Sequence, residues 1–209
     1  MAFTPLLALD RVRKVYRTGL FRKRDVFQFQ ADFTIAKPTI VGMMGPNGSG
    51  KTTLLELIAG ENSPTDGNVI CCGRNIHKIK YDQRRSLAVH HFRASQKRRL
   101  KKKAVPNFLL KPAGNSVRSI QLYDEFETED GFFGLLIRHF IKLHKNGHLV
   151  FLCIHPSKVL HLEVLKKICG QYLFIHKGTV TQMPDFETFI KDERVRDYLK
   201  EVPGDLDSV

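Results

Sequence analysis

The sequence predicts an α/β fold with a mostly parallel central sheet and an antiparallel β part at its start. From residue 39 onward, short apolar runs alternate with helical patterns, and strands that alternate with helices form parallel sheets. Before residue 39 the chain holds only strand patterns, which is typical of antiparallel pairing. A glycine-rich loop joins the first short apolar run to the first helical pattern. A length of 209 residues with 42% hydrophobic residues suits one core, so we expect a single domain over 1–209.

The first half of the chain carries four strand patterns and one helix pattern. Residues 3–17 alternate around leucine and valine, and residues 26–35 alternate around phenylalanine, as half-buried strands do. The helix pattern has its apolar residues on one side and stops at Gly60. Cys71 and Cys72 are adjacent in the last strand pattern, so we expect them on opposite faces. The expected elements are strands at 3–17, 26–35, 39–44 and 68–72 and a helix at 52–59.

The second half alternates strand and helix patterns. Its first strand pattern ends in Asp124 and Glu125, and its last two are separated by a short turn typical of a hairpin. The helix patterns repeat apolar residues every three or four positions. One charged helix is expected near the end of the sequence. The expected elements are strands at 119–123, 149–154, 172–176 and 179–182 and helices at 132–145, 159–169 and 186–202.

Composition argues against several classes of protein. Mean hydropathy is −0.24, and no run approaches the roughly eighteen apolar residues of a membrane span. The first residues lack a basic stretch followed by a long apolar one, so we expect no secretory signal. The four cysteines form no CxxC pair, which argues against zinc. We expect all four to be reduced packing residues of a cytosolic protein.

The net charge of +13 is concentrated in one segment. Eleven lysines and arginines lie between Asp82 and Asp124, and no acidic residue occurs between those two. We therefore expect a basic insert at 82–118. We consider three candidate partners for the positive charges at 84–118: an acidic partner surface, anionic lipid head groups or nucleic acid. Few aromatic residues lie nearby to stack on bases, so nucleic acid is the least favoured of the three partners.

A phosphate-binding loop is the most specific functional motif. The sequence GPNGSGKT fits G-x-x-x-x-G-K-[ST], in which glycines let successive backbone N–H groups point into one cavity. The helix that follows directs its positive end at the same place. Lys51 would contact the β- and γ-phosphates, and the Thr52 hydroxyl would ligate Mg²⁺. The expected nucleotide-binding residues of the loop are Gly45, Pro46, Asn47, Gly48, Ser49, Gly50, Lys51, Thr52 and Thr53.

The residues after the loop resemble an ABC-type ATPase, the nucleotide-binding subunit of an ABC transporter. That family has a leucine-rich helix, a P-T-x-G-x-V turn and a strand that ends in a glycine hairpin. This chain carries LIAG at 57–60, SPTDGNV at 63–69 and GRNI at 73–76. The resemblance covers a core at 3–80 and 119–190. It implies a P-loop NTPase fold of the ABC type, with ATP and Mg²⁺ as ligands.

The resemblance also implies roles for four further residues. The segment IQLYDE resembles the family's Walker B strand, so Asp124 would hold Mg²⁺ through water and Glu125 would polarise the attacking water. His155 follows an apolar strand, as the family's switch histidine does, and would contact the γ-phosphate. Tyr16 stands where the family places an aromatic ring against adenine.

The chain departs from the family between its two matching blocks. Fewer positions separate Lys51 from Asp124 than in the family, where a helical subdomain with the signature L-S-G-G-Q lies in that interval. No such signature occurs here, so we expect a reduced helical subdomain. The nearest candidates for the family's remaining motifs are Gln96 for the Q-loop glutamine, Asp130 for the D-loop and PAGNS at 112–116 for the signature.

The resemblance predicts a function and leaves two alternatives. We expect the ATP-binding subunit of a membrane complex, on the cytoplasmic face of the membrane, that couples ATP to movement of an integral membrane subunit. It would be a degenerate or heteromeric member, because a second ATPase subunit must supply the signature, and hydrolysis without that subunit would be weak. The alternatives are a soluble ABC-like ATPase that acts on nucleic acid or ribosomes, and an ATP-binding scaffold with little hydrolysis.

Overall fold

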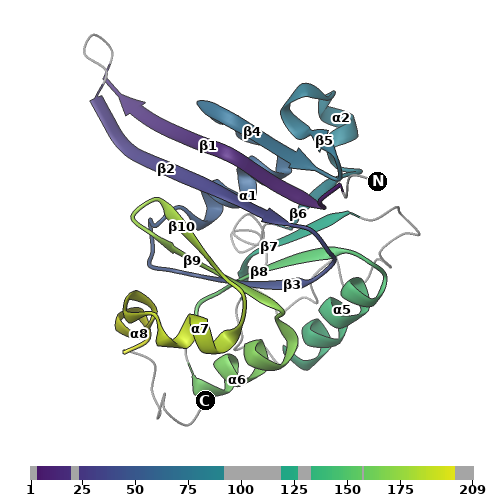
Figure 1. Cartoon of the computed structure of the whole chain (residues 1–209), viewed down its shortest axis with the longest axis vertical. Helices are drawn as coiled ribbons and strands as arrows, with labels where there is room; N and C mark the ends of the chain where they lie inside the picture. Colours follow the sequence, from purple (N-terminus) through teal and green to yellow (C-terminus); the bar gives the residue numbers. More distant parts are fainter. Residues whose placement is uncertain (1–3, 20–23, 92–118, 127–132, 157, 201–209) are drawn as a thin grey trace, which may run out of the picture.

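The computed structural model describes residues 4–19, 24–91, 119–126, 133–156 and 158–200 (Figure 1). Strands are the commonest regular element in this part of the chain. Their bounds are β1 Leu7–Thr18, β2 Arg24–Ile35, β3 Ile40–Met44, β4 Asp66–Cys71, β5 Arg74–Asn75, β6 Ala88–His91, β7 Ile120–Phe126, β8 Leu149–Ile154, β9 Gln171–His176 and β10 Thr179–Met183. The expected strands are therefore present, each within a few residues of its predicted bounds.

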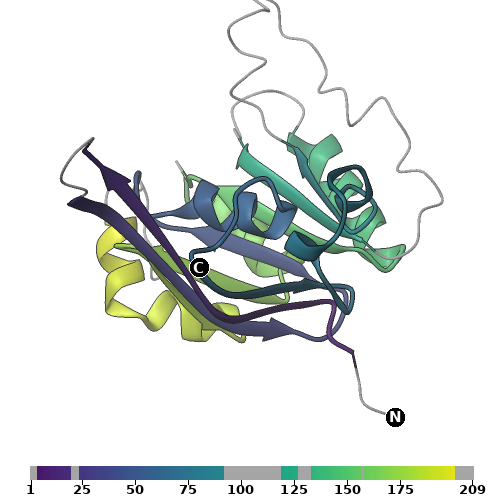
Figure 2. The same ribbon diagram turned by 90° about the horizontal axis from the view of Figure 1, so that it is seen from above.

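These ten strands form one sheet in the order β5-β4-β1-β2-β10-β9-β3-β8-β7-β6. The strands β9, β3, β8, β7 and β6 pair in parallel, which confirms the mostly parallel central sheet. The strands β5, β4, β1 and β2 pair antiparallel, which confirms the antiparallel part at the start. β1 and β2 run side by side across one side of the molecule (Figure 2). The hairpin of β9 and β10 joins the two parts of the sheet.

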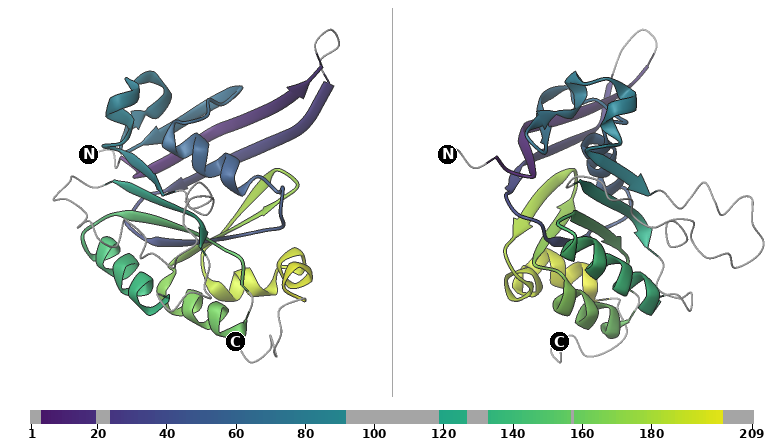
Figure 3. Two further views of the ribbon diagram at one scale, coloured as in Figure 1. Left: turned by 180° about the vertical axis from the view of Figure 1, so that it is seen from behind. Right: turned by 90° about the vertical axis from the view of Figure 1, so that its right-hand side faces the viewer.

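The helices lie on both faces of this sheet. Their bounds are α1 Lys51–Ala59, α2 Tyr81–Arg84, α5 Phe133–Lys145, α6 Val159–Ile168, α7 Phe186–Lys191 and α8 Glu193–Leu199, with a 3₁₀ turn η1 at Ile76–Lys78. The sheet curls around α1, which packs against β4 on one side and β6 and β7 on the other. The helices α5, α6, α7 and α8 gather along the opposite face (Figure 3).

Two groups of buried apolar side chains hold this arrangement together. The inner group lies between α1 and the concave face, with Leu54 and Leu57 of α1 fully buried in it. The outer group lies between the other face and the later helices, with Phe140, Leu162 and Phe189 fully buried in it. Each such side chain contributes about 1.5–3 kcal/mol to folding. Because its buried leucines pack α1 against the concave face of the sheet, the first turn of this helix has a fixed position.

β7 contains a bulge at its acidic pair. Tyr123 pairs with Leu152, but the next pair is Phe126 with Ile154, so β7 has one residue more than β8 in this interval. Bulges of this kind change the direction of a side chain and occur next to active sites. The strand therefore continues through Asp124, which is only 3% exposed, and ends at Phe126, three residues beyond the predicted end at residue 123.

Three further details differ from the sequence-based expectations. Residues 88–91, assigned to the basic insert, form the edge strand β6 of the parallel sheet. β4 ends at Cys71, and Cys72 has a φ of 49° in the turn that follows, so the two cysteines do not sit on opposite faces of one strand. The helix expected at 186–202 is interrupted at Asp192, whose side chain accepts a hydrogen bond from Arg194 N and caps α8.

All four cysteines are reduced thiols, and no disulfide bond joins any of them. In the described ranges no helix combines the length and hydropathy that a membrane span requires. Most of the basic insert, at 92–118, lies outside the described residues, as does the C-terminal segment from 201.

Candidate functional site

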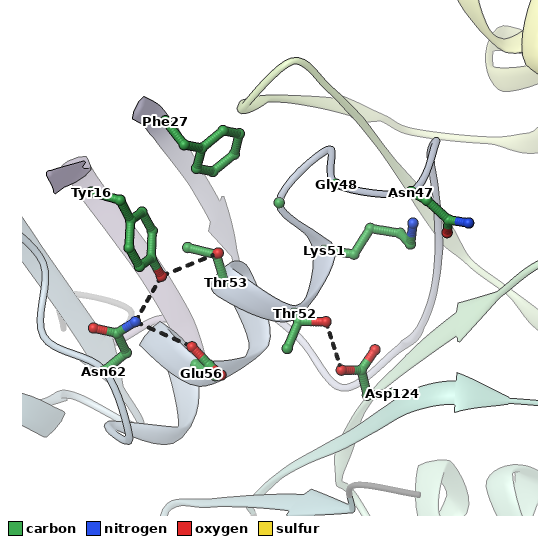
Figure 4. A pocket seen from close by; sticks show the side chains of 11 residues that line it. Tyr16, Phe27, Asn47, Gly48, Lys51, Thr52, Thr53, Glu56, Asn62 and Asp124 are labelled. Atoms are coloured by element: carbon green, nitrogen blue, oxygen red, sulfur yellow. Dashed lines mark hydrogen bonds between the residues drawn. The ribbon is translucent and has the colours of Figure 1, made fainter. Parts of the chain in front are cut away.

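A cavity of about 480 Å³ lies beside the first turn of α1 (Figure 4). Its walls come from β1, β2, the glycine-rich loop, α1 and β7, which are far apart in the sequence but adjacent around the concave face. The lining residues are Tyr16, Phe27, Asn47, Gly48, Gly50, Lys51, Thr52, Thr53, Glu56, Asn62 and Asp124. Many of the residues expected to bind nucleotide thus line the same cavity.

The loop between β3 and α1 depends on glycine at two positions in particular. Gly45 has a φ of 152°, and a Cβ there would lie 2.1 Å from the carbonyl oxygen of Ile175 in β9. Gly48 has a φ of 73°, and a Cβ there would meet no heavy atom within 4 Å, because this part of the loop faces the cavity. The first N–H groups of a helix have no carbonyl partner within it, so α1 presents donors to the same space.

Lys51 is held at the loop by its own ammonium group. Its Nζ donates to the carbonyl oxygens of Gly45 at 2.7 Å and Pro46 at 2.8 Å, and the residue is only 8% exposed. A buried positive charge needs anionic or carbonyl oxygens around it. The ammonium therefore lies where the negative charge of a phosphate would find a donor without a large movement of the loop.

Thr52 and Asp124 form the polar end of the cavity. Thr52 Oγ1 donates to Asp124 Oδ2 at 2.9 Å, although the two residues are 72 positions apart. Asp124 Oδ1 is buried and, among the described residues, has no hydrogen-bond partner. A hydroxyl and a carboxylate are ligands of the type that Mg²⁺ prefers, and a buried oxygen with spare lone pairs needs a cation or a donor. These residues fit a bound Mg²⁺.

Tyr16 stands at the other end of the cavity, where an extended network fixes its ring. Asn62 Nδ2 donates to the Tyr16 hydroxyl at 2.8 Å and to Glu56 Oε2 at 3.1 Å, and the same hydroxyl lies 3.3 Å from Thr53 Oγ1. Phe27 of β2 lies beside the ring, with centroids 6.0 Å apart. Two aromatic rings on neighbouring strands provide an apolar surface for a flat base.

Several expected site residues do not line this cavity. Gly45, Pro46 and Ser49 shape the loop from behind; Ser49, for example, is buried and accepts a backbone hydrogen bond from Gly178 N. His155 follows β8 and is exposed, and its Nδ1 lies 2.9 Å from the Tyr198 hydroxyl of α8.

Glu125 lies in the bulge of β7, directly after Asp124. Its role in polarising water and the role of His155 at the γ-phosphate stay predictions. The candidates Gln96, Asp130 and 112–116 lie outside the described residues.

Three lining residues were missed by sequence reasoning. Phe27 was recognised only as an apolar position of a strand, and Glu56 only as a helix position. Asn62 follows the helix stop at Gly60 and carries no motif. Its contact with Tyr16 spans 46 positions, so only the pairing of β1 with its neighbours could reveal it.

Comparison with known proteins supports this picture. The family model described as ABC transporter matches residues 29–140. An uncharacterized ABC transporter ATP-binding protein of Nostoc, all4389, is 36% identical over 74 residues, which are 35% of this chain and 22% of that protein. The lipoprotein-releasing system ATP-binding protein LolD of Shewanella denitrificans is 33% identical over 78 residues, 37% of this chain and 33% of that protein. The thiamine import ATP-binding protein ThiQ of Vibrio cholerae is 42% identical over 64 residues, 31% of this chain and 24% of that protein.

Each of these matches spans a third or less of the relative's own length. Among solved structures, a dimer of the ATP-binding cassette MJ0796 in a post-hydrolysis state, bound to ADP and Pi, is similar to this chain with a TM-score of 0.60. The likeness covers 85% of this chain and 98% of that chain at 16% identity, and it shows the fold. Because the family model matches more than half of the chain and the fold is that of an ATP-binding cassette, this protein belongs to the ABC transporter family.

Proposed function

We propose that the cavity binds ATP together with Mg²⁺, and that the chain is the ATP-binding subunit of an ABC-type membrane complex. The observation that carries the proposal is the contact between Thr52 and Asp124 at 2.9 Å, next to the buried ammonium of Lys51. A phosphate chain placed along the loop would meet a positive charge, the donors of a helix N-terminus and a site for a cation at once. An isolated glycine-rich turn would lack the carboxylate.

The two ends of the cavity suit the two ends of ATP. The rings of Tyr16 and Phe27 offer an apolar surface to the base, and the hydroxyl of Tyr16 is fixed by Asn62. At the phosphate end, Lys51 would exchange two loop carbonyls for phosphate oxygens, which are stronger acceptors because they are charged. When bound, Mg²⁺ would neutralise charge on the phosphates.

Hydrolysis would depend on two further residues and on a second subunit. Glu125 would accept a proton from the attacking water, and His155 would have to leave Tyr198 to reach the γ-phosphate. A second ATPase subunit would supply the signature that this sequence lacks. The names of the relatives, which describe lipoprotein release and thiamine import, support a membrane partner and transport. The chain would then act as a degenerate or heteromeric member, peripheral on the cytoplasmic face.

The decisive test of nucleotide binding is the substitution Lys51→Ala. Loss of a charged donor to phosphate costs about 1.5–3 kcal/mol or more, so affinity for a fluorescent ATP analogue should fall by roughly 10–100-fold or to an undetectable level. Lys37→Ala, which removes an exposed lysine of the turn before β3, is the matched control and should leave the affinity unchanged. Equal affinity in Lys51→Ala and the control would contradict the proposed site.

A further inference from the structure

A histidine that belongs to no recognised motif lies next to Asp124, at the polar end of the cavity. His90 lies in the edge strand β6, where it pairs with Leu122 of β7. Its side chain is only 3% exposed. His90 Nε2 lies 3.9 Å from Asp124 Oδ2, the oxygen that also accepts the Thr52 hydroxyl. One strand therefore brings an imidazole nitrogen to the carboxylate that would hold the cation.

A second carboxylate orients this imidazole. His90 Nδ1 lies 2.8 Å from Glu61 Oε2, just after the end of α1. An ionised carboxylate only accepts hydrogen bonds, so Nδ1 carries the hydrogen, and in the neutral ring Nε2 is then the lone-pair nitrogen. A carboxylate on one ring nitrogen is the usual support of a histidine that binds metal through the other.

The spacing between the imidazole and Asp124 suits an ion. A distance of 3.9 Å between Nε2 and Oδ2 is too long for a hydrogen bond. Two metal–ligand bonds of about 2.1 Å each span up to about 4.2 Å, so one cation can contact both atoms. Asp124 Oδ1, buried and without a hydrogen-bond partner in the described part of the chain, supplies further negative charge at the same place.

We propose that His90 Nε2 is a nitrogen ligand of the cation that accompanies the nucleotide, and that the site consequently favours Mn²⁺ over Mg²⁺. This inference rests on the proposed function, because nucleotide phosphates must complete the coordination. The ligands that the protein would supply are His90, Asp124 and the Thr52 hydroxyl. The described residues hold no group of three or more histidine, cysteine, aspartate or glutamate side chains arranged for a metal. Mg²⁺ strongly prefers oxygen, whereas imidazole suits first-row transition metals.

Pulsed electron paramagnetic resonance of bound Mn²⁺ tests the bond directly. The full-length chain is frozen with Mn²⁺ and uniformly ¹⁵N-labelled ATP, so that any ¹⁴N modulation comes from protein nitrogen. We expect a ¹⁴N modulation typical of a coordinated imidazole, and its replacement by a ¹⁵N modulation when the chain carries ¹⁵N-labelled histidine. This measurement needs no variant, so a folding defect cannot obscure it.

A pair of variants identifies the histidine. His90→Gln should abolish the modulation and weaken Mn²⁺–ATP binding by roughly 10–100-fold, while Mg²⁺–ATP binding changes by less than about threefold. The matched control is His91→Gln, since His91 is the neighbouring residue of the same strand but hydrogen-bonds to Gln121 instead. This control should keep the modulation and the preference for Mn²⁺.

The outcomes separate the two proposals. If the wild-type chain binds ATP with neither cation, the proposed function fails. If it binds ATP but shows no histidine modulation, or if His90→Gln keeps the wild-type preference between Mn²⁺ and Mg²⁺, then His90 only links two carboxylates. In that case the metal proposal is overturned while nucleotide binding stands.

Discussion

At the scale of single residues, a second histidine cluster lies on the outer face of β6 and β7. The His91 ring stacks on Tyr123 with centroids 4.5 Å apart, and the Tyr123 hydroxyl lies 2.9 Å from His139 Nε2. Burial, and then electrostatic interaction with His91 and Lys142, lower the pKa of His139 from 6.5 to about 4. Burial also lowers the pKa of His91. Both rings are therefore neutral in the folded protein at pH 7.

This cluster predicts a loss of stability on acidification. The unfolded chain protonates His139 near pH 6.5 and the folded chain only near pH 4, so between these values the unfolded state binds more protons. The free energy of unfolding should fall as the pH decreases through this window, and the effect should be absent above pH 7. Urea denaturation at pH 7.5, 6 and 5 measures it. His139→Gln, which keeps an acceptor for Tyr123, should show a shallower decrease; the same slope in both proteins would contradict this assignment.

At the scale of elements, the loop between β3 and α1 is positioned by contact with β9 as much as by its own sequence. The carbonyl of Ile175 lies against Gly45, and Gly178 N donates to Ser49 O at 2.9 Å. The bulge in β7 then brings Asp124 to the start of α1. The phosphate loop is therefore one part of a structure that needs three strands and a helix to be in register.

Two glycine substitutions in this loop should differ in cost. Gly45→Ala places a methyl group 2.1 Å from a backbone oxygen at a φ of 152°, so overpacking and backbone strain add to about 3 kcal/mol or more. Gly48→Ala meets no atom within 4 Å and pays only for its φ of 73°, about 1–2 kcal/mol. Urea denaturation of both variants provides the comparison, and equal losses of stability would show that β9 does not constrain the loop.

At the scale of the whole molecule, the curled sheet places the expected catalytic groups along one edge. β3, β6, β7 and β8 are parallel, so their carboxyl ends meet at the same side of the sheet, where ligands of α/β folds bind. Glu125 in β7 and His155 after β8 share this edge with the loop. The similar solved structure is a dimer bound to ADP and Pi.

Glu125→Gln tests how far this half-site hydrolyses ATP. If Glu125 polarises water, the variant should bind ATP with unchanged affinity, retain it during gel filtration, and release phosphate roughly 100-fold or more slowly than the wild type. We expect slow release from the wild-type chain alone, because the proposal assigns the signature to a second subunit. Glu187→Gln, an exposed change in α7, is the control. Identical phosphate release from wild type and Glu125→Gln would remove Glu125 from the mechanism.

Local patterns in the sequence were enough to predict most strands and helices and the phosphate-binding loop. Alternation with a period of two predicts β1 and β2, the G-x-x-x-x-G-K-[ST] pattern predicts where phosphate binds, and glycine at position 60 predicts where α1 ends. Such features are local, because they depend on backbone conformation and on the spacing of apolar residues within one element. They can therefore be predicted without knowledge of the fold.

Contacts between residues far apart in the sequence depend on the tertiary fold. Thr52 reaches Asp124 across 72 positions, Asn62 reaches Tyr16 across 46, and His90 stands between Glu61 and Asp124 because β6 is the edge strand next to β7. The bulge after Tyr123 and the helix break at Asp192 likewise depend on tertiary packing. These contacts depend on the order and register of strands in a curled sheet, which no local pattern encodes, and they turn a phosphate loop into a cavity with a polar end and an aromatic end.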